Sequence, residues 1–254
     1  MEREIVLSSY NNKNQGHNKP ENFITQFTRP LILDNNKNYV IGLNRIIHMS
    51  FTWYNVSITH NNRTFRYSET DSSGTTSFKT ITLEPGVWNY QDFDNRIKSI
   101  TRKEVGGSYR YPITLTFNET TFRVIIVIAT GYQLDLRTSN FNDLIGFDKV
   151  LLGSGTHIGP RVPNLSQDTD IINIHCDLIS DSSVDGNNTD IIFSFSSSEL
   201  TASYSFTQEP RRVLFSPINK TSISNIKMYV TDGKRRILDL NGADVAYSLI
   251  LKSV

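Results

Sequence analysis

The sequence predicts an all-β protein built as an antiparallel β-sandwich. Apolar and polar residues alternate with a period of two in many short segments along the chain, which is the pattern of half-buried strands. Clusters of Gly, Asn, Asp and Ser separate these segments at short spacing. Strands and helices do not alternate regularly, so a parallel βαβ architecture is not favoured.

The first third of the chain supplies several strands joined by polar turns. The pattern at residues 39–56 is too long for one ordinary strand, and Gly42 with the polar pair Asn44-Arg45 predicts a bulge or bend within it. Residues 34–38 form a turn signal because Asp and Asn favour turn conformations. Strands are expected at residues 5–7, 23–29, 39–56, 64–68 and 78–82.

One segment, about residues 89–103, has the period of an amphipathic helix. Asn89 can act as its N-cap, and Asp92 in the first turn favours the helix dipole. The glycine pair Gly106-Gly107 is expected to stop the helix. An apolar stripe at i, i+4 and i+7 consists of Phe93, Ile97 and Ile100.

After the helix the chain returns to strands. A hairpin is predicted at about residues 111–128, and Gly146 is expected to close a short helical turn at residues 142–147. Residues 153–169 are rich in Gly and Pro and predict a long loop. Asp232-Gly233 predicts a tight hairpin turn. The remaining strands are expected at residues 172–179, 191–195, 202–206, 223–230, 237–240 and 245–251.

These elements suggest one sandwich interrupted by an insertion. We expect residues 1–79 and 151–254 to form the sandwich, and residues 80–150 to form an inserted unit of one helix and one hairpin.

Composition limits the classes of function. The formal net charge of the 254 residues is +1, which argues against general polyanion binding, and no sequence-specific nucleic-acid site is expected. Cys176 is the single cysteine, so no intrachain disulfide can form. We find no long apolar run and no signal-peptide pattern, so we expect no membrane partner and folding in a reducing compartment, the cytoplasm or the nucleus.

The sequence offers no convincing reactive centre. The five histidines are scattered, and His175 and Cys176 are adjacent on a predicted strand, so their side chains point to opposite faces. We therefore expect one core thiol and one solvated imidazole. The acidic loop with Asp181, Asp185 and Asp190 lacks the spacing of an EF-hand. No catalytic, cofactor-binding or metal-binding residue is predicted.

Two further patterns have an ordinary structural explanation. The basic runs Lys234-Arg235-Arg236 and Arg211-Arg212 are short, and such runs usually form solvated surfaces rather than anion sites. The aromatic residues Phe51, Trp53 and Tyr54 could line a ligand groove, but aromatic residues in a β-sandwich more often belong to the core.

An ordered set of segments along the whole chain carries a family resemblance. The segments are residues 18–23, 29–33, 39–46, 51–55, 85–90, 142–147, 173–179 and 239–242. Their order resembles the single jelly-roll penton, or minor capsid protein, of Polinton/Maverick elements and related virus-like transposons.

The resemblance implies a fold, a location and partners. It implies an eight-stranded jelly roll in a virus-like capsid, with five copies around a vertex and contacts to the double jelly-roll major capsid protein. It carries no catalytic residues. We expect the arm at residues 8–22 and the loop at residues 153–169 to reach neighbouring subunits, because both have few core residues.

Two other functions stay open on the sequence alone. The chain could be a ligand-binding β-sandwich, either a carbohydrate-binding module or a TNF-like trimer. A glycan-binding protein would expose aromatic residues beside carboxylates or amides, whereas Trp53 and Trp88 lie in patterns for a strand and for the start of the helix. An enzyme would need titratable residues converging in a pocket, which the sequence does not indicate.

Overall fold

The computed structural model describes residues 2–10, 18–50, 53–70, 73–167, 169–180, 182–184, 186–197, 205–218 and 220–254. The chain forms two compact units. Unit 1 comprises Met1–Trp53 and Asp168–Val254, and unit 2 comprises Tyr54–Gln167.

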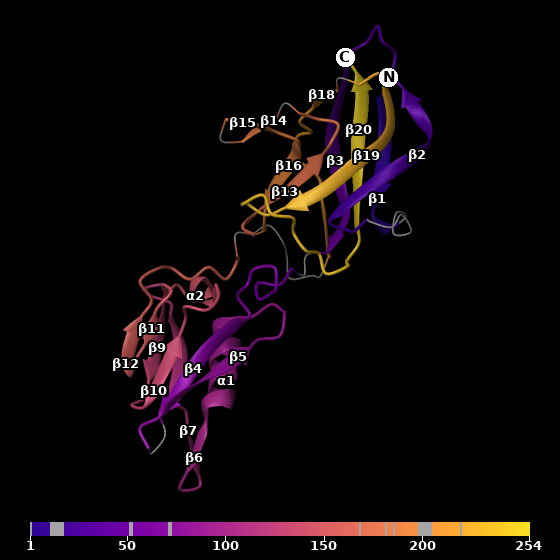
Figure 1. The fold of residues 1–254 in the computed structure, drawn as a ribbon. Helices are drawn as coiled ribbons and strands as arrows, with labels where there is room; N and C mark the ends of the chain where they lie inside the picture. The colour runs from indigo at the N-terminus through magenta and orange to yellow at the C-terminus, as the bar shows by residue number, and fades with distance from the viewer. Residues whose placement is uncertain are drawn as a thin grey trace. The chain divides into compact units, whose positions relative to one another are not determined.

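Unit 1 contains two main antiparallel sheets (Figure 1). The strands of the first sheet, in spatial order, are β1 (Glu2–Ser8), β20 (Val245–Ser253), β3 (Tyr39–Ser50) and β17 (Ser205–Gln208), with β18 (Ser216–Ile218) also paired to β3. The strands of the second sheet are β16 (Ile191–Ser196), β13 (Ile171–Cys176), β19 (Ser222–Thr231) and β2 (Asn22–Ile32). A small separate hairpin consists of β14 (Ser182–Val184) and β15 (Asn187–Thr189).

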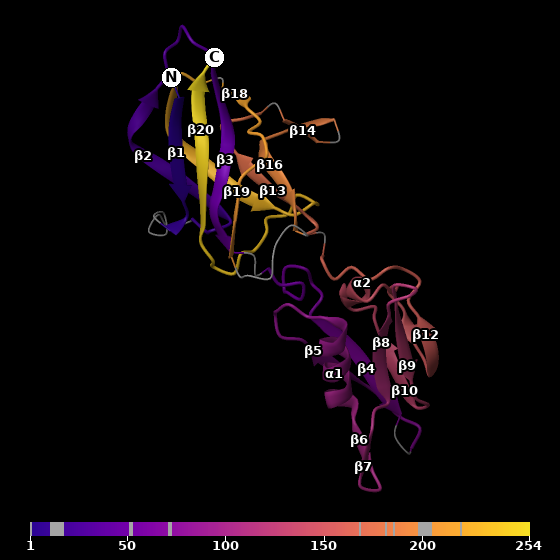
Figure 2. The same cartoon turned by 180° about the vertical axis from the view of Figure 1, so that it is seen from behind.

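The strand order of unit 1 is that of a jelly roll. When β17 and β18 count as one strand, the eight strands in chain order are arranged 1-8-3-6 in one sheet and 5-4-7-2 in the other. Early strands therefore pair with late strands in both sheets, as the two Greek keys of a jelly roll require. Figure 2 shows the same sheets from behind. The predicted antiparallel sandwich, a single jelly roll, is confirmed.

The inner faces of both sheets share one apolar core. Ile41 and Leu43 from β3 and Ile174 from β13 are at most 1% exposed. Phe23 and Tyr247 stack with their ring centroids 6.3 Å apart. Alternation along each strand supplies these residues, since every second side chain points inward.

The long pattern at residues 39–56 is not one strand, as expected. β3 is continuous from Tyr39 to Ser50, and the described residues 53–54 lie outside any strand. The register of its pairing with β20 shifts at two places. Between the partners of Ala246 and Tyr247 the chain skips Ile47, and between the partners of Ser248 and Leu249 it skips Asn44. The bulge predicted at Asn44 is confirmed. Gly42 is regularly paired with Ile250 instead.

Unit 2 has its own sheets and its own core. One sheet has the order β11 (Leu151–Leu152), β10 (Tyr132–Asp135), β4 (Thr64–Thr70) and β5 (Thr76–Thr82). The other has the order β12 (Gly155–Ile158), β9 (Arg123–Ile128) and β8 (Ile113–Asn118). The unit also contains α1 (Tyr90–Thr101), α2 (Phe141–Leu144) and a hairpin of β6 (Lys103–Val105) and β7 (Ser108–Arg110).

Helix α1 begins where its cap is encoded. The Asn89 side chain accepts a hydrogen bond from the Asp92 amide at 2.9 Å, and the Asp92 carboxylate accepts one from the Asn89 amide at 3.0 Å. Phe93 and Ile97 are buried in the core of unit 2. The carboxylate of Asp94 accepts a hydrogen bond from the Leu115 amide at 2.9 Å, which ties α1 to β8.

The unit boundaries differ from the sequence-based values of 80 and 150. Residues 54–79 and 151–167, expected in the sandwich, belong to unit 2. Strand β4 pairs with β10, and β12 pairs with β9, so both segments complete sheets of that unit. Alternation predicts that a segment is a strand, but it does not specify the strand with which the segment pairs.

Three local predictions are wrong. Helix α1 ends at Thr101, and Gly106-Gly107 forms the turn of the β6–β7 hairpin, because both glycines have positive φ. The predicted loop at residues 153–169 contains β12. Residues 237–240 form no strand and contribute one bridge, between Thr231 and Ile237. The predicted strand at residues 202–206 lies mostly outside the described residues.

Candidate functional site: open hollows and a buried polar network

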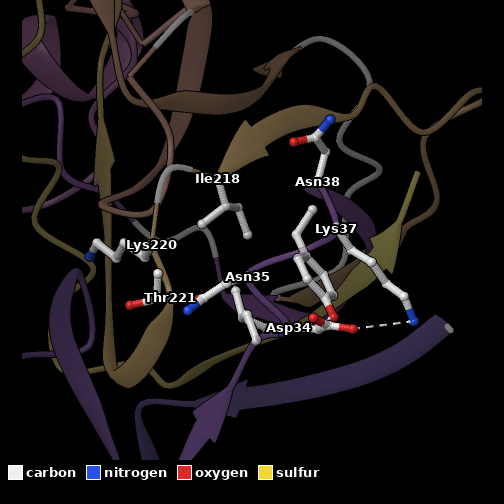
Figure 3. A pocket seen from close by; sticks show the side chains of 9 residues that line it. Asp34, Asn35, Lys37, Asn38, Ile218, Lys220 and Thr221 are labelled. Atoms are coloured by element: carbon white, nitrogen blue, oxygen red, sulfur yellow. Dashed lines mark hydrogen bonds and ion pairs between the residues drawn. The ribbon is translucent and has the colours of Figure 1, made fainter.

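A small hollow lies in unit 1 between the turn from β2 to β3 and the segment before β19 (Figure 3). Its volume is about 200 Å³, smaller than the roughly 300–1,000 Å³ of most ligand sites. The Asp34 carboxylate pairs with the Lys37 ammonium at 3.7 Å, and the Asp34 amide donates to the Tyr39 hydroxyl at 3.2 Å. These contacts hold the turn between β2 and β3. The residues that line the hollow do not bring reactive side chains together.

A larger, open hollow of about 670 Å³ lies where β16 and the end of β17 meet. Its lining mixes apolar and polar groups from Phe193, Ser194, Phe195, Gln208, Glu209, Pro210 and Arg211. An open surface of this composition at a sheet edge is suited to contact with a macromolecule rather than to enclosure of a small substrate.

A third hollow runs along the exposed side of α1 in unit 2. Its volume is about 490 Å³. The residues that line it, here called the α1 groove, are Val87, Trp88, Asp92, Asn95, Arg96 and Ser99.

A network of polar side chains surrounds His175 in unit 1, on β13, an inner strand of the second sheet. The His175 Nδ1 atom lies 2.7 Å from an Asp190 carboxylate oxygen, and its Nε2 atom lies 2.9 Å from the Thr231 hydroxyl. The Tyr229 hydroxyl donates to both oxygens of Asp190, at 2.9 and 2.8 Å. The Tyr229 ring stacks on the imidazole with centroids 4.2 Å apart.

The network has the connectivity of a hydrolase triad, hydroxyl to imidazole to carboxylate. Its hydroxyl belongs to Thr231, however, which is only 2% exposed, so a substrate cannot reach it. Burial lowers the pKa of His175, although the Asp190 carboxylate opposes that effect. A neutral imidazole that donates from Nδ1 to Asp190 and accepts at Nε2 satisfies both contacts. The arrangement therefore ties β13, β19 and the start of β16 together.

The structure corrects the prediction of a solvated imidazole. His175 is 4% exposed because the Tyr229 ring and Asp190 cover it on the outer face of the sheet. Cys176 points the other way, into the core, as predicted, and burial raises the pKa of its thiol to about 12. The pairing of β13 with both β16 and β19 creates the network, and sequence reasoning could not supply that register.

The other candidate residues do not form a reactive site in the described part of the chain. Asp181 and Asp185 lie outside the described residues, whereas Asp190 contacts His175. Among the residues with described positions, no three His, Cys, Asp or Glu side chains are grouped so that they could hold a metal ion. Arg236 of the predicted basic run pairs with the buried Asp232 at 2.7 Å.

The aromatic candidates divide between core and surface. Trp53 packs against the core of unit 1, whereas Phe51 lies outside the described residues. Within the residues the structure describes, no helix is both long and apolar enough to cross a membrane.

Apolar side chains are exposed at the edges of unit 1. β1 and β2 are edge strands of the two sheets and carry Val6 (59% exposed) and Ile32 (77% exposed). Leu214, 69% exposed, precedes the edge strand β18. Figures 1 and 2 both show β1 with β2 on one side of unit 1, and β16 with β18 on the other.

No family model matches this sequence, and no curated protein matches it. Among solved structures, the fold is similar to that of a mavirus penton protein, with a TM-score of 0.49, 10% identity and coverage of 100% of both chains. It is also similar to a chain in the 3.5 Å cryo-EM structure of the Sputnik virophage, with a TM-score of 0.44 and 12% identity. That match covers 99% of this chain and 97% of the other.

Proposed function

We propose that this chain is a structural capsid protein of a virus-like particle encoded by a Polinton/Maverick-type element. In this proposal five copies form the capsid vertex as the penton, or minor capsid protein, and contact the double jelly-roll major capsid protein. The protein acts through its surfaces and catalyses no reaction.

The observation that carries the proposal is the strand order of unit 1, 1-8-3-6 against 5-4-7-2. Jelly rolls occur in viral capsids, lectins and cupins, and a fold alone does not select among them. The ordered set of segments that resembles the penton family, spread over the whole chain, favours the capsid role.

The described polar groups support the same choice. A cupin-type enzyme needs clustered metal ligands, and no such cluster occurs among the residues with described positions. The His175 network is connected enough for chemistry but is closed to substrate, since His175 and Thr231 are both at least 95% buried.

A ring of five requires a heterologous interface, in which one patch meets a different patch. Unit 1 has two different sides, one formed by β1 and β2 and the other by β16, β17 and β18. The exposed Val6 and Ile32 lie on the first side, and Leu214 lies next to the second. We propose that these two sides meet between neighbouring copies.

Two further segments remain candidates for subunit contacts. Residues 11–17 of the predicted arm lie outside the described residues, and β1 includes Ser8 at its end. In the segment 153–169, β12 is part of a sheet, whereas Val162 is 62% exposed and available for contact.

The first test is the mass of the purified full chain in solution, measured by light scattering. One copy has a mass of 28.9 kDa, so five copies would give about 145 kDa if a closed ring forms. A trimer of about 87 kDa would favour the TNF-like alternative and contradict the pentamer.

A substitution at the proposed contact sharpens this test. Ile32→Arg places a charge on a side chain that is 77% exposed, so the fold of one copy should be unaffected. We expect the mass to fall to that of a single copy, because the charge would be buried without a partner in the interface. Val105→Arg, on the exposed β6–β7 hairpin, is the matched control and should leave the mass unchanged.

A further inference from the structure

We propose that the α1 groove of unit 2 binds a glycan, with one pyranose ring packed against Trp88. The groove combines an aromatic surface with a carboxylate, an amide, a guanidinium and a hydroxyl. Sugars present apolar C–H faces and many hydroxyl groups, so they are recognised by this combination of groups. The inference does not depend on assembly, because every lining residue belongs to one unit of one chain.

The indole of Trp88 is held in place before any ligand arrives. The Trp88 amide donates to the Asn55 side-chain oxygen at 2.8 Å, and the Trp88 carbonyl accepts from the Asn55 side-chain nitrogen at 2.7 Å. The indole Nε1–H donates to the Glu84 carbonyl at 3.0 Å. The ring stacks on Phe93 with centroids 5.6 Å apart and planes inclined by 10°. A ring fixed by these contacts loses little conformational entropy on binding.

The indole also lies close to the Gly86 backbone. A Cβ atom at Gly86 would lie 3.4 Å from the indole Nε1 atom, which is an ordinary van der Waals contact. The adjacent Val87 is 69% exposed and extends the apolar surface of the groove. The chain thus presents a partly exposed aromatic platform at the start of α1.

The polar groups of the groove follow one face of α1. They lie at i, i+3, i+4 and i+7, the spacing that places side chains in a row on a helix. The row consists of Asp92, Asn95, Arg96 and Ser99. Hydroxyl groups on a sugar above Trp88 could therefore meet donors and acceptors along the row.

The charges in the groove favour a sugar over a polyanion. Asp92 brings a negative charge to the same face as Arg96, so a run of phosphates would meet repulsion as well as attraction. The structure records no ion pair for the Arg96 guanidinium with any described residue, so it is available to a ligand. A guanidinium binds a carboxylate with two parallel hydrogen bonds, which would favour a carboxylate-bearing sugar there.

The dimensions of the groove agree with one or two sugar residues. Its volume of about 490 Å³ lies within the roughly 300–1,000 Å³ range of small-ligand sites. The groove is also open to solvent, so the bound sugar can be part of a longer glycan.

The test is a titration of the full chain with lactose, tri-N-acetylchitotriose and 3′-sialyllactose, followed by calorimetry and by ¹H–¹⁵N NMR. We expect saturable binding of at least one probe, with a shift of the Trp88 indole N–H signal. The Trp53 indole belongs to unit 1 and should not shift, which provides an internal control.

Three variants connect binding to the groove. Trp88→Phe keeps an aromatic ring on Phe93 and should weaken binding by about tenfold or more, as the loss of part of an apolar contact does. Asn95→Ala should also weaken binding. Arg96→Gln should remove any preference for sialyllactose over lactose, whereas Arg102→Gln, an exposed arginine outside the groove, should leave that preference unchanged.

Several results would overturn the proposal. It fails if none of the three sugars produces a saturable shift in the folded protein, or if Trp88→Phe and Asn95→Ala bind as tightly as the parent. It also fails if the Trp88 signal responds to protein concentration but not to sugar, since the groove would then be a contact between protein chains. The mass of the protein decides the capsid proposal separately, so the two can fail independently.

Discussion

Asp135 shows how a single carboxylate can organise unit 2. Its side chain is fully buried and accepts hydrogen bonds from Arg137 Nε at 2.8 Å and from Arg66 at 2.5 Å. These arginines, Arg137 above all, hold its pKa well below the ordinary value near 4. The carboxylate therefore stays ionised in the folded protein throughout the ordinary pH range. Its contribution to stability is complete above about pH 5 and is lost progressively as the pH falls through the unfolded value near 4 towards the lower folded pKa.

We predict that Asp135→Asn lowers the free energy of unfolding by about 1–3 kcal/mol. The amide cannot satisfy two guanidinium groups, but Arg66 and Arg137 are 38% and 51% exposed and can regain water. Asp148→Asn is the control, because Asp148 is 72% exposed and its pairing with Arg161 should contribute at most about 1 kcal/mol. Urea denaturation measures both, and equal losses would contradict the prediction.

His175 gives a prediction for pH. Burial lowers its pKa in the folded protein below the ordinary value of 6.5, and Arg235 acts in the same direction. The unfolded chain therefore takes up a proton at a higher pH than the folded chain does. The contribution of the neutral His175 to the free energy of unfolding is complete above pH 6.5. It is lost as the pH falls from 6.5 towards the folded pKa, by about 1.4 kcal/mol for each pH unit by which the folded pKa lies below 6.5.

NMR titration of the imidazole should give a pKa below 6.5, and Asp190→Asn should lower it further because the carboxylate favours the protonated form. His175→Gln should reduce the loss of stability between about pH 7 and pH 5. A His175 pKa at or above 6.5 would show that the partnership with Asp190 outweighs burial.

At the scale of elements, β3 is an inner strand that pairs with β20, and the segment before β18 crosses close to its backbone at Gly42. A Cβ atom at Gly42 would lie 2.5 Å from a methyl carbon of Val213 and 2.6 Å from the Leu214 carbonyl oxygen. The sequence suggested that this glycine marks a bend, but its role is to admit a crossing segment close to the strand.

We predict that Gly42→Ala destabilises the protein by about 1–3 kcal/mol, because the crossing backbone must move. Gly153→Ala is the control, since a Cβ atom added there would have no neighbour within 4 Å, and it should stay within about 0.5 kcal/mol of the parent. Thermal and urea denaturation compare the two. Similar stability of both variants would mean that the segment at residues 213–215 is not held against β3.

Local signals predicted elements well when the information lay within a few residues. The capping residues Asn89 and Asp92 fixed the start of α1, and Gly146 ended α2 with a positive φ of 73°. Gly106-Gly107 was interpreted wrongly because glycines both end helices and form hairpin turns. The strands on each side, β6 and β7, have three exposed residues each, so no alternating apolar pattern indicated a hairpin. The α1 groove had a sequence signal in its i, i+3, i+4 and i+7 polar row, but its aromatic floor required the fold.

At the scale of the whole molecule, the chain leaves the jelly roll after β3 and returns at β13. The fold class followed from the alternating pattern, but the boundaries of unit 2 did not, because strands in both units have the same period. Strands β4, β5 and β12 could have belonged to either unit by pattern alone. Only their pairing with β10 and β9 assigns them.

A two-sheet sandwich with a second unit inserted between β3 and β13 suits a protein that acts by contact. The jelly roll supplies edges and exposed apolar side chains for neighbours, and the inserted unit offers a separate surface that can vary without disturbing them. If both proposals hold, unit 1 makes the contacts between neighbouring copies and unit 2 binds glycans.

The most direct measurement is a cryo-EM reconstruction of particles made by co-expressing this chain with a double jelly-roll major capsid protein from the same element. We predict density for five copies of unit 1 around each fivefold axis, joined through the side formed by β1 and β2 and the side formed by β16, β17 and β18. Shells whose vertices lack this chain, or that hold it in threes at other positions, would contradict the account.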